Sequence, residues 1–153
     1  MNHAESLKTA IVSLRRADHL TYMTLPLVKD SRLIWVILEN LYFSAISGMD
    51  AVLEYEKMYK PLMPLPDNFE GRFGLFRDKL INKYNITIQE VELIRKLRDM
   101  IESHKNSPVE FSRPGKFVIC NENYRIRTVS IQDIKEYIVV ARGFLGKINN
   151  TLK

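Results

Sequence analysis

The strongest constraint on the fold is one long segment that is apolar on every side. Over residues 33–55 hydrophobic side chains occupy all faces of a helix, and the acidic residues that interrupt them are few: Glu39, Asp50 and Glu54. A helix of this kind must be covered all round, either by other helices or by lipid. Because acidic residues break the run, we predict the central helix of a bundle and not a membrane span.

The central helix is expected to begin after Asp30 or Ser31, either of which can cap it, and to extend as far as Tyr59. Gly48 lies in its interior, where glycine costs about 1 kcal/mol relative to alanine. Small residues surround that glycine, namely Ser44, Ser47 and Ala51. This pattern predicts that a neighbouring helix approaches closely at Gly48.

Four further helices are predicted from apolar periodicity. Pro26 is expected to end the first by biasing Leu25 away from helical angles. The last begins at Ser130, which forms a capping pattern with Asp133, and its apolar residues recur every three or four positions as in a bundle seam. The predicted ranges are 4–25, 67–80, 87–107 and 130–152.

Residues 108–129, between the last two predicted helices, have a different composition. β-branched and aromatic residues cluster over 117–120 and over 124–129, with Asn121, Glu122 and Asn123 between them. This pattern predicts a small β-hairpin, with a structured loop as the alternative. We therefore expect one domain over residues 1–153 that is an all-α, up-and-down bundle of four to five helices with a small hairpin before the last helix.

The charge of the chain favours an acidic partner such as nucleic acid. The formal net charge is +5 at pH 7. Cys120 is the single cysteine, which excludes an internal disulfide and fits a reducing cytoplasm. Residues 1–18 carry charges throughout and lack the apolar core of a signal peptide. We expect a cytoplasmic protein that does not enter the membrane.

Arg98, Asp99 and His104, near the end of the fourth predicted helix, offer catalytic chemistry. A fixed cation can hold a phosphodiester, and an imidazole can protonate a departing 5′-oxygen. On an ideal helix His104 continues an apolar stripe, whereas Arg98 lies about 120° away. The two converge only if the helix frays or if a second copy contributes. The alternative is structural, with His104 packed and Arg98 paired to Glu102.

An arginine, a polar residue and then a histidine several positions on, within a basic helical chain, resemble the signature of the HEPN superfamily. This resemblance implies a metal-independent endoribonuclease that cleaves RNA through the 2′-hydroxyl and needs no cofactor. It also implies a homodimer with both motifs near the two-fold axis, and a role as a toxin or defence component with a protein antitoxin. In that scheme His104 transfers protons, Arg98 binds the scissile phosphate and Asp99 orients one of them.

Basic residues that follow the motif are candidates for nucleic-acid binding: Lys105, Arg113, Lys116, Arg125 and Arg127. On a strand Arg125 and Arg127 share one face. A second functional hypothesis is therefore a non-catalytic bundle that binds RNA or a protein partner through this basic loop, and a solvated hairpin face is the plainer alternative. We expect no metal site, because His3, His19 and His104 lack ligand spacing.

Overall fold

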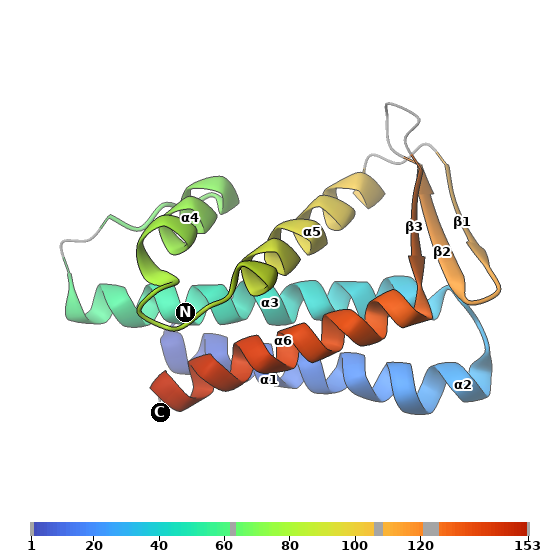
Figure 1. The fold of residues 1–153 in the computed structure, drawn as a ribbon, viewed down its shortest axis with the longest axis horizontal. Coiled ribbons are helices and arrows are strands. Elements are labelled where there is room, and N and C mark those ends of the chain that lie inside the picture. The colour runs from blue at the N-terminus through green and yellow to red at the C-terminus, as the bar shows by residue number, and fades with distance from the viewer. Residues whose placement is uncertain (1, 62–63, 106–108, 121–125, 153) are drawn as a thin grey trace.

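The computed structural model describes residues 2–61, 64–105, 109–120 and 126–152, with only the backbone described for 109–111 and 120. It is mostly helical, with a small sheet between the last two helices (Figure 1), as expected. The helices are α1 (His3–His19), α2 (Leu25–Val28), α3 (Leu33–Tyr59), α4 (Phe69–Leu75), α5 (Ile88–Lys105) and α6 (Ile131–Leu152), and two π-helical turns are η1 (Leu20–Thr24) and η2 (Phe76–Leu80). The strands are β1 (Val109–Arg113), β2 (Lys116–Cys120) and β3 (Ile126–Ser130).

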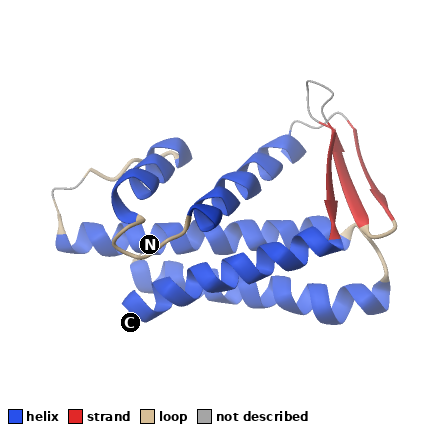
Figure 2. Cartoon of the chain, viewed as in Figure 1, coloured by secondary structure: helices blue, strands red, loops and turns tan. Residues whose placement is uncertain are grey.

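The long helix α3 lies at the centre of the bundle and packs against α1, α5 and α6 (Figure 2). On a helix of about 100° per residue its buried residues span about 200° of the circumference, and they include Ile34, Ile37, Leu38, Leu41, Ala45, Met49, Val52 and Leu53. On the remaining side Val36 and Phe43 are exposed, so the cover is not complete all round. By length and composition alone α3 is also a candidate membrane span, but 56% of that apolar window is buried inside the structure. The burial of α3 against other helices agrees with the prediction of a core helix.

At Gly48 the helices α3 and α6 pack closely together. A Cβ atom added there would lie 2.7 Å from Leu145 Cδ2 and 3.0 Å from Phe144 Cε2. The prediction of a close neighbour at Gly48 is therefore confirmed. The seam of α6 that makes this contact is buried along its length, through Ile134, Ile138, Ala141, Leu145, Ile148 and Leu152.

The prediction that Pro26 ends the first helix was wrong. The chain passes from α1 through the π-helical turn η1 into α2, where Pro26 occupies the first turn, and the helical path ends at Lys29 with a φ of 57°. A proline inside an α-helix clashes with the carbonyl four residues earlier. The wider π-helical turn, in which the Leu25 amide donates to the Leu20 carbonyl, accommodates the ring without breaking the helix.

The predicted hairpin is present, and a third strand that the sequence did not predict extends it. The sheet has the antiparallel order β1-β2-β3. Phe117 and Val129 are paired across β2 and β3, and both are buried. Strand β1 escaped prediction because five residues with two charged side chains carry little signal of their own. The hairpin loop, 121–125, lies outside the described residues.

Capping side chains define the starts of four helices, among them α1, where Asn2 and Glu5 form a capping box. Asn68 accepts a hydrogen bond from the Gly71 amide at 2.7 Å at the start of α4. Thr87 and Glu90 form a reciprocal capping box at the start of α5, and Ser130 and Asp133 form one at the start of α6. The predicted cap at Ser130 is thus confirmed.

A buried carboxylate ties the end of α3 to the turn before α5. Glu56 is 1% exposed, and its Oε1 accepts a hydrogen bond from Tyr84 Oη at 2.8 Å and lies 2.6 Å from Lys83 Nζ. Lys60 Nζ is 3.6 Å from Oε2. Burial raises the pKa of Glu56, but the hydrogen bonds from Lys83 and Tyr84 and the two ammonium charges outweigh it, so that the pKa falls below its usual value.

We predict that Gly48→Ala destabilises the protein by about 1–2 kcal/mol, because the new methyl group must displace Leu145 and Phe144 in a packed core. Gly146→Ala on α6 is the matched control, since a Cβ there meets nothing within 4 Å. The free energy of unfolding of the control should rise by about 0.5–1 kcal/mol, because alanine has a higher helix propensity than glycine. Urea unfolding measures both. Equal stability of the two variants would contradict close packing at Gly48.

We predict that Glu56→Gln lowers the free energy of unfolding by about 2 kcal/mol at pH 7, since it leaves Lys83 and Lys60 without their carboxylate. A lowered pKa stabilises the fold above the unfolded-state pKa of about 4.3, and this stabilisation is lost as the pH falls through the folded-state pKa. The gap in the free energy of unfolding between wild type and Glu56→Gln should therefore narrow at pH 3. Exposed Glu136→Gln is the control. A gap independent of pH would refute the ion pairing.

Candidate functional site

Arg98 lies on the side of α5 that faces α3 and α4. Its Nη1 donates a hydrogen bond to Tyr42 Oη at 2.8 Å, and Nη2 lies 3.2 Å from Glu102 Oε1. The guanidinium carbon stands 4.8 Å from the centre of the Phe69 ring. The side chain remains 30% exposed. The guanidinium is thus held by a neutral hydroxyl, a carboxylate and an aromatic face.

His104 lies in the last turn of α5 and contacts a different part of the molecule. Its ring stacks on that of Trp35 in α3, with 3.7 Å between centroids and 20° between planes. Trp35 in turn lies 5.9 Å from the ring of Phe117 in β2. His104 is partly buried. His104 therefore connects α5 to α3, and Trp35 connects α3 to the sheet.

The structure places Arg98 and His104 on two sides of one helix. Six residues separate them, which on a regular helix means about 9 Å along the axis and about 120° around it. Helix α5 remains regular through Lys105, so fraying does not bring them together. Within one chain the two side chains have different partners, Tyr42 and Glu102 for Arg98 and Trp35 for His104.

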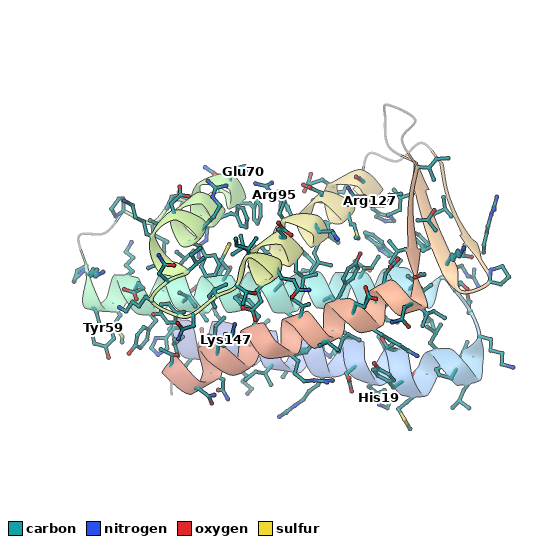
Figure 3. All side chains as sticks on the ribbon, in the orientation of Figure 1. His19, Tyr59, Glu70, Arg95, Arg127 and Lys147 are labelled. Carbon is teal, nitrogen blue, oxygen red and sulfur yellow. The ribbon has the colours of Figure 1, made fainter. Side chains whose placement is uncertain are left out.

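Asp99 points away from both of these residues. Its Oδ1 lies 3.8 Å from Arg95 Nη1, and its side chain is about half exposed. Arg95 also makes two hydrogen bonds of 2.7 Å to Glu70 of α4 (Figure 3), and these bonds lower the pKa of Glu70. In one chain Asp99 therefore contacts Arg95 and orients neither Arg98 nor His104.

The predicted basic residues are spread over both faces of the sheet. Arg113 and Lys116 are directly paired across β1 and β2, so they share one face. Arg127 is paired with Ile119 and so lies on the opposite face, on the side of β3 that faces α5 (Figure 3). Lys105, at the end of α5, lies 3.5 Å from Glu102. The predicted shared face of Arg125 and Arg127 cannot be described, because Arg125 lies outside the described residues.

A site that sequence reasoning missed lies where α5, α6 and β3 meet. Lys96 Nζ of α5 stands 5.5 Å from the centre of the Tyr137 ring of α6, and Arg127 acts electrostatically on the same tyrosine. Burial and the Asp133 carboxylate raise the pKa of Tyr137, and the Arg127 charge opposes them. A groove of about 210 Å³ runs beside these residues, and its lining also includes Leu93, Glu92 and Glu136.

The two cations of this site, Lys96 and Arg127, are exposed and available to a ligand. In the part of the chain that the structure describes, no carboxylate lies within 4.0 Å of either one. Glu92 and Glu136 line the same groove, but neither is paired to these cations. We refer to Lys96, Arg127 and Tyr137 as the α5–α6 cation site. Lys96 precedes the other two residues by about 30 to 40 positions in the chain, which explains why periodicity gave no signal.

Among the described residues no group of three histidine, cysteine or acidic side chains is arranged to hold a metal ion. Comparison with protein-family models, with curated proteins and with solved structures gave no match. The resemblance to the HEPN superfamily therefore stands on Arg98, Asp99, His104 and the helical layout.

We predict that His104→Ala shifts the fluorescence emission of Trp35 to longer wavelengths, because water replaces the imidazole on one face of the indole. Trp35 is the sole tryptophan, so the signal reports one site. Loss of the ring pair should also cost about 1 kcal/mol of stability. His19→Ala, at an exposed position of α1, is the control and should leave the emission unchanged. Unchanged emission in His104→Ala would mean that the stack does not form.

Proposed function

We propose that this protein binds single-stranded RNA, with the α5–α6 cation site as the point of contact. The observation that carries this proposal is that two exposed cations act on Tyr137: Lys96 Nζ stands 5.5 Å from its ring, and Arg127 lies within electrostatic range of it. Neither cation is paired to a carboxylate among the described residues. Cations attract the phosphate backbone, and an aromatic ring can stack a base. The net charge of +5 adds a general attraction to RNA.

Catalysis is not part of this first proposal, since it requires Arg98 and His104 to act on the same phosphodiester. A general acid must reach the departing oxygen within hydrogen-bond distance, while the cation holds the same phosphate. In one chain the two side chains occupy different sides of α5 and contact different partners. Their contacts support packing and orientation as their role in the isolated chain.

The second candidate is a homodimeric, metal-independent endoribonuclease, as the HEPN resemblance implies. One observation favours it: Arg98 keeps 30% of its side chain exposed while Tyr42 and Glu102 orient its guanidinium. A two-fold axis beside α5 would bring Arg98 of one copy towards His104 of the other. A toxin or defence role and a protein antitoxin belong to this candidate. Cleavage that depends on both Arg98 and His104 separates it from simple binding.

Binding is tested by fluorescence anisotropy with a labelled single-stranded RNA over a range of salt concentrations. Removal of two phosphate contacts in Lys96→Ala/Arg127→Ala should lower the affinity at least ten-fold and reduce the slope of log K against log salt by about 1.4. The charge-matched control is Lys8→Ala/Lys79→Ala, two exposed lysines away from the site. If both double variants lose the same affinity for RNA, the binding depends on the net charge and not on this site, which would contradict the proposal.

The aromatic contribution has its own matched pair of variants. Tyr137→Phe keeps the stacking ring and should bind RNA within two-fold of wild type. Tyr137→Leu keeps apolar volume but removes the ring, and should weaken binding about five-fold or more. Circular dichroism checks that both remain helical. Equal affinity of the two variants would mean that no base stacks on Tyr137.

A further inference from the structure

Helix α2, the β1–β2 turn and the start of α6 lie at one end of the molecule (Figure 1). A pocket of about 400 Å³ is lined by residues of these elements. Its apolar lining comes from Leu25 and Pro26 of α2, Pro114 of the turn, and Ile131 of α6. The size falls within the range of about 300–1,000 Å³ typical of small-molecule sites. This pocket is separate from the α5–α6 cation site.

Hydrogen bonds between its walls hold the pocket in shape. The Gly115 amide donates to Ser31 Oγ at 2.9 Å, and the Ile131 amide donates to the Gly115 carbonyl at 3.2 Å. Gly115 has a φ of 72°, which favours glycine at this turn. On the opposite wall the hydroxyl of Thr21, within the π-helical turn η1, donates to the Ala17 carbonyl at 2.7 Å. The hydrogen-bonding groups of Ser31, Gly115 and Thr21 are thus used within the protein.

Two lysines provide the charge of the pocket, Lys29 at the end of α2 and Lys135 on α6. No carboxylate among the described residues lies within ion-pair distance of either ammonium group. The acidic residues nearby in sequence have other roles, since Asp30 pairs with Arg32 and Asp133 caps α6. Lys135 Nζ instead stands 5.4 Å from the ring of Tyr22. The pocket therefore combines an apolar lining with two positive charges.

We propose that this pocket binds a small amphipathic anion, with an apolar chain against Leu25, Pro26 and Ile131 and a carboxylate or phosphate head group between Lys29 and Lys135. An apolar ligand would leave the two ammonium groups without an ionic partner. A fully polar anion would leave the apolar lining exposed to water. Both features are satisfied together by a chain of several carbon atoms with one anionic end. The π-helical turn shapes the pocket, as such turns frequently do at functional sites.

The test is a titration followed by two-dimensional nuclear magnetic resonance, with octanoate as the anionic probe and 1-octanol as its uncharged match. Octanoate should shift the amide signals of Gly115 and Ile131, which lie in the pocket walls. It should bind about ten-fold more tightly than 1-octanol, because it adds two partly screened ion pairs. Octyl phosphate in a parallel titration distinguishes a phosphate head group from a carboxylate.

Variants of the two lysines make the test specific. Lys29→Gln/Lys135→Gln should reduce octanoate affinity about ten-fold, to the level of 1-octanol, and should leave 1-octanol binding unchanged. Lys8→Gln/Lys79→Gln removes the same charge elsewhere and should stay within two-fold of wild type. The proposal is overturned if neither anion shifts Gly115 and Ile131, or if the two double variants bind octanoate equally well. Neither result depends on RNA binding.

Discussion

Burial of the apolar residues of α3 under three other helices is the constraint on which the rest of the structure depends. Its apolar residues require cover from α1, α5 and α6 together, and Gly48 allows α6 to approach where any larger side chain would collide. Two aromatic side chains of α3 lie at its border with α5. These are Trp35 and Tyr42, and each meets a polar residue of α5.

The same packing divides the surface of α5 into sides with different chemistry. One side presents Arg98 to Tyr42, and the last turn presents His104 to Trp35. A third side presents Lys96 to Tyr137 of α6. A motif that is compact in the sequence is thus distributed around the helix, whereas residues far apart in the sequence form a common site. For this reason we propose that RNA binds at the α5–α6 cation site and not at the Arg98–His104 motif.

The fold could be predicted from sequence where one helix carries its own signal. The all-round apolar α3, the α6 seam, the Ser130 cap and the approach at Gly48 all follow from local pattern and backbone chemistry. Pro26 was misjudged because a π-helical turn, which has no sequence signature, relieves its clash. The stack on Trp35 and the α5–α6 cation site depend on how helices pack. Such contacts form only when distant segments pack together.

The most direct measurement is cleavage of a mixed single-stranded RNA in EDTA by wild type, Arg98→Ala, His104→Ala and an equimolar mixture of the two variants. If the single chain binds RNA without cutting it, all four samples leave the RNA equally intact under conditions where anisotropy shows binding. Cleavage by wild type that leaves 2′,3′-cyclic phosphate ends and is lost in both variants would contradict this assignment. Recovery of activity in the mixture would then place Arg98 and His104 of two copies in one shared site.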